Sequence, residues 1–314
     1  MSLLSRKYFQ NEKAAFDHLE SILWADGVVC PHCGSVDSAG KLDGVKNKKG
    51  VVRLGLWKCY SKGCRKQFTV RVGTVFESAH IPLHKMLQAV YLMSASKKGI
   101  SAHQLHRTLE ITYKSAWFLA HRIREAMRDG TLAPMGGQGG VVEIDETFIG
   151  RLDGMPKGKQ GGWAHKNVVL TLVERGGSAR SFHIGSTSMA EILPIVHTNV
   201  RRESAVMTDE ASWYRSLGAR YVSHDAVNHK AYEWARGGVT TNTIEGYFSI
   251  FKRGMKGVYQ HCKEKHLHRY LAEFDFRYSN RVALGVDDAA RTERALQGIV
   301  GKRLTYRGPG ESAN

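Results

Sequence analysis

Three acidic residues stand where the ligands of catalytic metal ions would be expected: Asp145, Asp209 and Glu245. Asp145 lies in an apolar, strand-like run at 141–145, and Asp209 ends a second such run at 205–209. Glu245 opens a helical pattern after 35 further residues. Hard divalent cations prefer oxygen ligands, and paired metal ions activate and stabilise oxygens in phosphoryl transfer. Two strand carboxylates and one helix carboxylate therefore predict a metal site for that chemistry.

The helix predicted at 241–254 gives Glu245 a suitable position. Its apolar stripe has residues at i, i+4 and i+7: Ile244, Phe248 and Phe251. A neighbouring polar stripe has the same spacing: Glu245, Ser249 and Lys252. Because seven residues make nearly two turns, one stripe can pack on a sheet while the other faces a cleft. We expect Glu245 to bind metal and Lys252 to hold a phosphate; a solvated helix without a role is the alternative.

Three further residues near these acids are ambiguous. His224 is predicted to orient a phosphate or a metal-bound water, although a lone histidine near a strand end is more often a structural hydrogen-bonding group. Glu146 and Glu210 directly follow the two aspartates. Adjacent residues of a strand point to opposite faces, so we expect the aspartates, not these glutamates, to be ligands.

Four of the five cysteines have the spacing of a structural zinc site. They follow the pattern C-x2-C, 25 residues, C-x4-C: Cys30, Cys33, Cys59 and Cys64. Two such thiolate pairs suit a tetrahedral zinc ion. Strand-like runs at 51–58 and 67–72 complete a zinc ribbon, and an amphipathic helix at 8–24 is expected to pack on it. Four ordinary buried thiols are the alternative, and Cys262 has no predicted partner.

The charge balance favours a polyanionic partner. Lys plus Arg exceed Asp plus Glu by 46 to 29 in 314 residues, a net charge of +17. Residues 41–71 hold ten Lys or Arg against one acid, which favours contact with DNA phosphates over an ordinary solvated face. The chain has no run of about 20 apolar residues that would span a bilayer, and no apolar signal core. We therefore expect a cytoplasmic, nucleoid-associated protein without a membrane partner.

Three helices are predicted after the ribbon. Their apolar periodicity places them at 83–96, 102–109 and 114–127. Ser101 is the expected N-cap of the second helix, and 111–112 forms a turn. A short helix, a turn and a longer helix resemble a helix-turn-helix, whose second helix enters the major groove. The expected DNA contacts are Tyr113, Lys114, His121, Arg122 and Arg124; a bundle that only packs is the alternative.

The remaining residues alternate strands and helices. The expected order is strands 141–149, 167–174 and 179–185, helix 189–201, strand 205–209, a short helix near 211–217, a short strand at 220–223, and helices 241–254 and 264–280. A three-stranded meander followed by strands linked through helices fits an RNase H-like mixed sheet. Further DNA contacts are expected from Lys157 and Lys159 in a glycine-rich loop, and from Arg253 and Lys256 in the basic stretch 249–281.

These patterns predict an α+β multidomain chain. Its parts are an N-terminal helix with a zinc ribbon at 1–78, a helix-turn-helix domain at 79–130, a glycine-rich linker at 131–140, an RNase H-like catalytic domain at 141–300 and a flexible tail at 301–314.

Several short motifs carry a family resemblance. The acids stand in Asp145-Glu146-Thr147, Thr208-Asp209-Glu210 and Asn242-Thr243-Ile244-Glu245, followed by Lys252. These motifs resemble the DDE transposases of bacterial insertion sequences. Cys30-Pro31-His32-Cys33, with Cys59 and Cys64, narrows the resemblance to the ISXO-like group, which joins a zinc ribbon to a helix-turn-helix and a DDE domain. Residues 224–229 and 270–274 are also similar to that group, so the resemblance covers residues 8–281.

The resemblance implies a chemistry and partners. Asp145, Asp209 and Glu245 would bind two Mg2+ (or Mn2+) ions, the four cysteines would bind structural Zn2+, and Lys252 would lie beside the phosphate. The partners would be double-stranded DNA, both terminal inverted repeats and target, and further copies of the chain in a dimer or higher oligomer. The enzyme would cut the element end and join its 3′-hydroxyl to target DNA. Two alternatives are an RNase H-like nuclease that cuts without joining, and a zinc-ribbon DNA-binding regulator.

Overall fold

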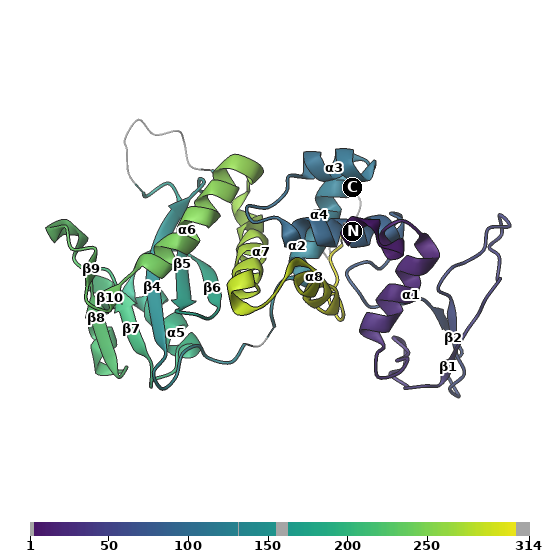
Figure 1. The fold of residues 1–314 in the computed structure, drawn as a ribbon, viewed down its shortest axis with the longest axis horizontal. Helices are drawn as coiled ribbons and strands as arrows, with labels where there is room; N and C mark the ends of the chain where they lie inside the picture. The colour runs from purple at the N-terminus through teal and green to yellow at the C-terminus, as the bar shows by residue number, and fades with distance from the viewer. Residues whose placement is uncertain (1–2, 131, 155–162, 306–314) are drawn as a thin grey trace. The chain divides into compact units, whose positions relative to one another are not determined.

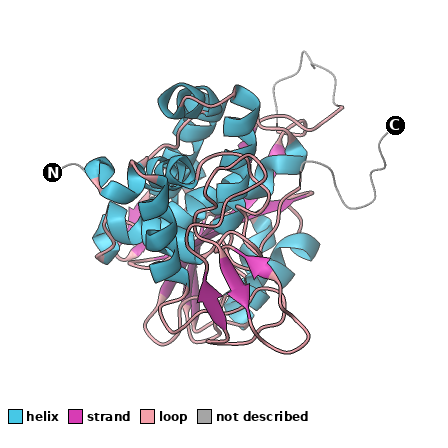
Figure 2. Ribbon diagram, turned by 90° about the vertical axis from the view of Figure 1, so that its right-hand side faces the viewer, coloured by secondary structure: helices cyan, strands magenta, loops and turns pink. Residues whose placement is uncertain are grey.

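The structure of the chain, a computed structural model, describes residues 3–130, 132–154 and 163–305 (Figure 1). The chain divides into unit 1, which comprises Met1–Ser96, Ile100–Met127 and Asp287–Asn314, and unit 2, which comprises Lys97–Gly99 and Arg128–Val286. Helices and strands are mixed along the chain (Figure 2), as the predicted α+β class requires. Within the described ranges, no helix has the length and hydrophobicity needed to cross a bilayer.

Helix α1 (Glu12–Leu23) is followed in unit 1 by a small antiparallel sheet. Its strands are β1 (Ala39–Lys41), β2 (Trp57–Cys59) and β3 (Gln67–Phe68). They are shorter than the runs predicted at 51–58 and 67–72. Gly55 keeps the preceding residues out of β2, because its φ of +62° is left-handed and a Cβ there would lie 2.2 Å from the Phe16 ring.

Charged residues fasten α1 to this sheet. Lys41 Nζ, on β1, lies 2.8 Å from both Asp17 Oδ1 and Glu20 Oε2 on α1. The indole nitrogen of Trp57, on β2, donates a hydrogen bond to Glu20 Oε1 at 3.1 Å. The predicted packing of the N-terminal helix on the ribbon is therefore confirmed.

The next helices of unit 1 lie close to their predicted positions: α2 (Leu83–Ala95), α3 (Ala102–Leu109) and α4 (Tyr113–Ala126). Ser101 caps α3, since its side chain accepts a hydrogen bond from Gln104 N at 3.1 Å. Thr112 caps α4 through Ser115 N at 3.2 Å. Glu110 ends α3 with a φ of +51°. A tight turn thus joins α3 to α4, as a helix-turn-helix requires.

Helix α8 (Asp288–Gln297) belongs to unit 1, although the sequence placed residues 141–300 in one catalytic domain. It packs on α2 (Figure 1), where Arg291 Nη1 donates to Ser94 O at 3.2 Å. Ala295 and Leu296 are buried. No helix was predicted for residues 288–297, so both α8 and its place in the core of unit 1 come from the structure.

Unit 2 contains a five-stranded sheet in the order β6-β5-β4-β7-β8. The strands are β4 (Val141–Ile149), β5 (Asn167–Glu174), β6 (Ala179–Ile184), β7 (Ala205–Thr208) and β8 (Ser223–Ala226). β4, β5 and β6 form an antiparallel meander, while β7 and β8 run parallel to β4. This is the predicted RNase H-like mixed sheet. The last strand begins three residues later than the run predicted at 220–223.

Helices cover both faces of this sheet. One face packs on α5 (Met189–Asn199) and on the short 3-10 helix Ser212–Ala219. The opposite face packs on α6 (Asn242–Gly254) and α7 (Leu267–Ser279). Figure 1 shows α6 crossing the sheet in front of β4 and β5. Since strand residues alternate between faces, β4 directs Val142 and Ile144 towards α5 and its odd-numbered residues towards α6.

The segment predicted as a linker at 131–140 packs against unit 2 over its described residues 132–140. Met135 is buried in the core, and its backbone hydrogen-bonds to Asn199 and Arg201. Gly137 N donates to Ser204 Oγ at 2.9 Å. A Cβ on Gly136, whose φ is +74°, would lie 2.2 Å from the same Oγ, so this glycine permits a close approach. Gly136 and Gly137 therefore allow this segment to pack closely against Ser204, so it does not act as a free linker. Residues 306–314 of the predicted tail lie outside the described residues.

Candidate functional site

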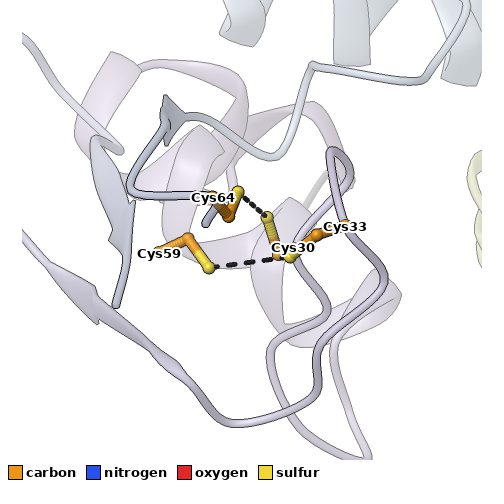
Figure 3. Close-up of side chains that lie close together, drawn as sticks. All are labelled: Cys30, Cys33, Cys59 and Cys64. Carbon is orange, nitrogen blue, oxygen red and sulfur yellow. Dashed lines mark hydrogen bonds between the residues drawn. The ribbon is translucent and has the colours of Figure 1, made fainter. Parts of the chain in front are cut away.

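The four predicted zinc ligands come together in unit 1 (Figure 3). All four sulfur atoms lie within 4.8 Å of one another. Cys30 Sγ is 3.8 Å from Cys64 Sγ, and Cys33 Sγ is 3.7 Å from Cys59 Sγ. A tetrahedral site with Zn–S bonds of about 2.3 Å has sulfur–sulfur edges of about 3.8 Å. The cluster therefore fits a zinc ion.

Little besides this cluster holds the ribbon together. The apolar groups around the sulfurs are few, chiefly Phe68, Trp24 and Trp57. The Trp24 ring centroid lies 5.5 Å from that of Trp57 and 5.9 Å from that of Phe68, edge to face in both cases. Strands of two or three residues around so small a core need a further link between them. Four thiolates on one metal ion would supply it.

Asp145 and Asp209 lie at the same level of two adjacent parallel strands in unit 2. β4 and β7 pair from Val141↔Ala205 to Glu143↔Met207. Extending this register by two residues places Asp145 beside Asp209, which directly follows β7. Asp145 points to the α6 face of the sheet, and Glu245 lies in the first turn of α6.

The charges of Asp209 and Glu245 both act on Asp145. Burial raises the pKa of Asp145 well above its ordinary value, and the charges of Glu146, Asp209 and Glu245 raise it further. Burial also raises the pKa of Asp209. Carboxylates held together against their own repulsion are stabilised by a nearby cation. The oxygen donors and the unrelieved negative charge fit a hard divalent metal ion.

A buried ion pair fixes the start of α6 on β4. Glu143 is fully buried, and its Oε1 accepts a hydrogen bond from Arg175 Nε at 2.6 Å. Its Oε2 accepts one from Ile244 N, in the first turn of α6, at 2.9 Å. Arg175 Nη1 and Nη2 donate to Gly238 O at 2.8 Å and to Thr240 O at 2.7 Å. We call these contacts the Glu143–Arg175 clamp.

The clamp positions Glu245 relative to Asp145. Glu143 stands two residues before Asp145 on the same face of β4, and the amide that it holds belongs to the residue before Glu245. Glu245 Oε1 accepts a further hydrogen bond from Thr241 Oγ1 at 3.2 Å. Sequence patterns alone did not single out Glu143. The signal was its i, i+2 spacing from Asp145, which puts a second acid on the same face of β4.

Comparison with known proteins identifies the same two parts. Residues 138–279, which span β4 to α7, match the ISXO2-like transposase domain, and residues 10–67 match the transposase zinc-ribbon domain. The chain thus contains an ISXO2-like transposase domain and a transposase zinc-ribbon domain. One relative is described as an uncharacterized protein in transposable element ISH50 of Halobacterium salinarum. It is 26% identical over 290 residues, which cover 86% of this chain and 92% of the relative.

Two basic residues of this transposase-family domain lie at the carboxylates. Burial lowers the pKa of Lys252, while Asp145 and Glu245 act to raise it, so its ammonium group is close to both. His229 Nε2 lies 3.8 Å from Glu245 Oε1, and the His229 charge acts to lower the pKa of Asp209. The sequence placed His229 near this helix but assigned it no function; only the fold brings it to the acids.

The other predicted and doubtful polar residues have structural partners. His224 Nε2 lies 2.9 Å from Thr208 Oγ1, a contact that links β8 to β7, which is the structural alternative for this residue. Glu146 Oε2 accepts a hydrogen bond from Tyr214 OH at 2.5 Å on the α5 face. Glu210 Oε2 accepts one from the His229 amide at 3.1 Å.

The predicted DNA contacts of this chain differ in exposure. Lys114, Arg253 and Lys256 are exposed. Arg122 and Arg124 are only 8% and 2% exposed. Arg122 Nη1 donates to Glu77 O at 2.9 Å, and its guanidinium group lies 4.8 Å from the Phe118 ring centroid. We therefore do not keep Arg122 and Arg124 among the DNA contacts, because these side chains are buried. Lys157 and Lys159 lie outside the described residues.

Proposed function

We propose that this chain is a DNA transposase that cuts the ends of its element and joins the freed 3′-hydroxyl to target DNA. One observation carries the proposal: the charges of Asp209 and Glu245 both act on the buried Asp145 within a domain that matches the transposase family. Terminal inverted repeats and target DNA would be its double-stranded substrates. Because two ends must be brought together, we expect at least two copies of the chain to act in one complex.

The chain's own residues would prepare the phosphate for attack. Asp145, Asp209 and Glu245 would hold two Mg2+ ions, which when bound activate the attacking oxygen and stabilise the leaving oxygen. Lys252, next to Asp145 and Glu245, would neutralise a non-bridging oxygen of the scissile phosphate. The Glu143–Arg175 clamp would keep Glu245 at a fixed distance from the aspartates.

Both steps exchange one phosphorus–oxygen bond for another. In cutting, a water oxygen bonds to phosphorus, the bond to the 3′ oxygen breaks, and the products are a 3′-hydroxyl and a 5′-phosphate. In joining, that 3′ oxygen bonds to a phosphorus of target DNA while the target's own 3′ oxygen leaves. The protons pass to solvent and to the leaving oxygens, and no protein residue is modified.

The zinc ribbon and the helix-turn-helix would hold the DNA ends. We propose Zn2+ as the structural ion of the four cysteines, and Lys114, at the start of α4, as a contact to DNA phosphate. Arg253 and Lys256 follow Lys252 along α6 and its extension, so they would continue the phosphate contact outward from the site.

The Glu245→Gln variant tests the proposal. A labelled duplex carrying the DNA sequence that flanks the gene is incubated with protein and Mg2+, and cut and joined products are separated on a denaturing gel. We expect the variant to bind the duplex like the wild type but to lose both products by at least about 10³-fold. Retained strand transfer would overturn the assignment.

A control variant tests whether removing an acidic charge matters only at the site. Glu203 is an exposed acid of the same unit, and its Glu203→Gln variant should cut and join normally. Wild-type protein that cuts but never joins would support the nuclease alternative. Wild-type protein that binds the duplex but neither cuts nor joins it would support the alternative of a zinc-ribbon DNA-binding regulator.

A further inference from the structure

An exposed aromatic pair stands beside the carboxylates. Phe148 on β4 and Trp163 have ring centroids 4.9 Å apart and planes tilted by 30°. Lys166 Nζ lies 4.3 Å from the centroid of Trp163. Trp163 nevertheless remains 59% exposed. An indole that packs near another ring and a cation, yet is open to solvent, is a surface on which a flat group can stack.

Two hollows meet at this pair. The larger, of about 700 Å³, is lined by Glu146 and Asp209 and by a second indole, Trp213. The smaller, of about 370 Å³, is lined by Lys252 and Lys256. Both hollows share the same wall: Phe148, Trp163 and Lys166. An aromatic hollow lined by both acidic and basic side chains thus lies next to one whose charged lining is only basic.

We propose that the larger hollow holds one unpaired nucleobase of the DNA strand being cut, stacked on Trp163, with its phosphate towards Lys252 in the smaller hollow. The inference rests on the proposed function, because it takes the DNA end as substrate. It adds a binding site for a base that has left its duplex.

Charge decides which part of a nucleotide each hollow takes. A phosphate in the larger hollow would meet acids, Glu146 and Asp209 among them, as well as basic side chains, whereas the smaller hollow offers it Lys252 and Lys256 and no acid. An uncharged base has no such conflict, and every base offers a face to an indole. The larger volume lies in the range of ligand pockets, about 300–1,000 Å³. Arg215 and Lys230, also in its lining, supply positive charge for the flanking backbone.

A stacked base must first leave its partner. Enzymes that need such access favour DNA whose bases are already unpaired, because unstacking costs a few kcal/mol. The hollow should therefore distinguish DNA with a short single-stranded 3′ overhang from the same DNA with a blunt end.

The test compares these two DNAs. Fluorescence anisotropy measures the binding of a labelled duplex with a four-nucleotide 3′ overhang, and of its blunt counterpart, in chelator and without Mg2+. For Trp163→Ala we expect overhang affinity to fall about 10-fold or more, the loss typical of one stacked base, while blunt-duplex affinity changes less than about twofold. Trp163→Phe should restore most of the overhang affinity. An equal loss on both DNAs, or no loss, overturns the proposal.

A matched control variant and a crosslinking experiment test whether the effect of Trp163 is direct. Trp234 is also 59% exposed but does not line either hollow, so Trp234→Ala should keep the wild-type ratio of overhang to blunt affinity. In wild-type protein, 5-iodouracil in the overhang should crosslink on irradiation to the peptide containing Trp163 or Trp213. Crosslinks found only elsewhere overturn the site. Because binding is measured without metal, this failure is distinct from a wild-type protein that cannot cut DNA.

Discussion

The two groups of candidate metal ligands are held in different ways. The cysteine sulfurs lie within 4.8 Å of one another between strands of two or three residues. Asp145 lies in a nine-residue strand, Asp209 directly follows a four-residue strand, and Glu245 lies in a 13-residue helix. Over the described part of the chain, the cysteines are the one group that gathers three or more ligand atoms within 4.8 Å. The thiolate site is closed, while the carboxylate site is more open.

This difference is the one expected between a metal ion that stabilises a fold and the proposed metal ions that act on a substrate. Four protein ligands leave a zinc ion no position for another group. The carboxylates are positioned by a sheet, by α6 and by the Glu143–Arg175 clamp; burial, and then the charges of Glu146, Asp209 and Glu245, raise the pKa of Asp145. Unit 1 should therefore depend on its metal for stability, whereas unit 2 should keep its fold without one.

Zinc removal should give the largest effect. We expect a strong zinc chelator, or Cys59→Ser, to unfold the ribbon, since zinc binding supplies on the order of 10 kcal/mol to such small modules. Limited proteolysis should then cut between residues 28 and 70, while β4 to α7 stay protected. Zinc content by mass spectrometry is the companion measurement. Cys262→Ser, outside the cluster, should keep one zinc per chain. Full zinc loss with unchanged protease resistance would contradict this picture.

The second-largest effect should come from a substitution that weakens the Glu143–Arg175 clamp. Glu143→Gln keeps an acceptor for Ile244 N but removes the charge that pairs with Arg175. We expect Mn2+ affinity, measured by calorimetry, to fall about 10- to 100-fold, as is typical when groups behind metal ligands are changed. Glu233→Gln breaks an ion pair with Arg236 that is more exposed than the clamp. This control variant should leave the Mn2+ affinity unchanged. Wild-type Mn2+ affinity in Glu143→Gln would show that the clamp does not position Glu245.

A smaller, pH-dependent effect should come from Asp275. Burial raises the pKa of this carboxyl from 3.8 to about 7, against the hydrogen bonds donated by Tyr247 and Ser181. Between those values the folded chain binds a proton that the unfolded chain has released, so stability falls as pH rises across this window. Urea unfolding, followed by hydrogen exchange in α7, should show this slope, and Asp275→Asn should flatten it. An unchanged slope in the variant would assign the effect to other groups, such as Asp145.

Local patterns predicted most elements of the chain correctly. β4, β5 and β6 lie within one residue of their predicted ends, and Ser101 caps α3 as expected. Alternation over strands and i, i+4, i+7 spacing on α6 depend only on neighbouring residues. Whether a basic residue is exposed depends on distant ones, so Arg122, predicted as a DNA contact, instead lies against Glu77 and Phe118.

The sequence by itself picked out the candidate ligands: the four cysteines by their spacing, and the three acids by their place at strands and a helix. Only the tertiary structure decided what surrounds them. It brought His229 to Glu245, joined Glu143 to the start of α6, placed α8 in unit 1 and put Trp163 and Asp209 in the lining of one hollow. The physical reason is the range of the interactions along the chain. Secondary structure follows from interactions over a few residues, whereas burial, charge coupling and hydrogen bonds across 100 residues exist only once the chain has folded.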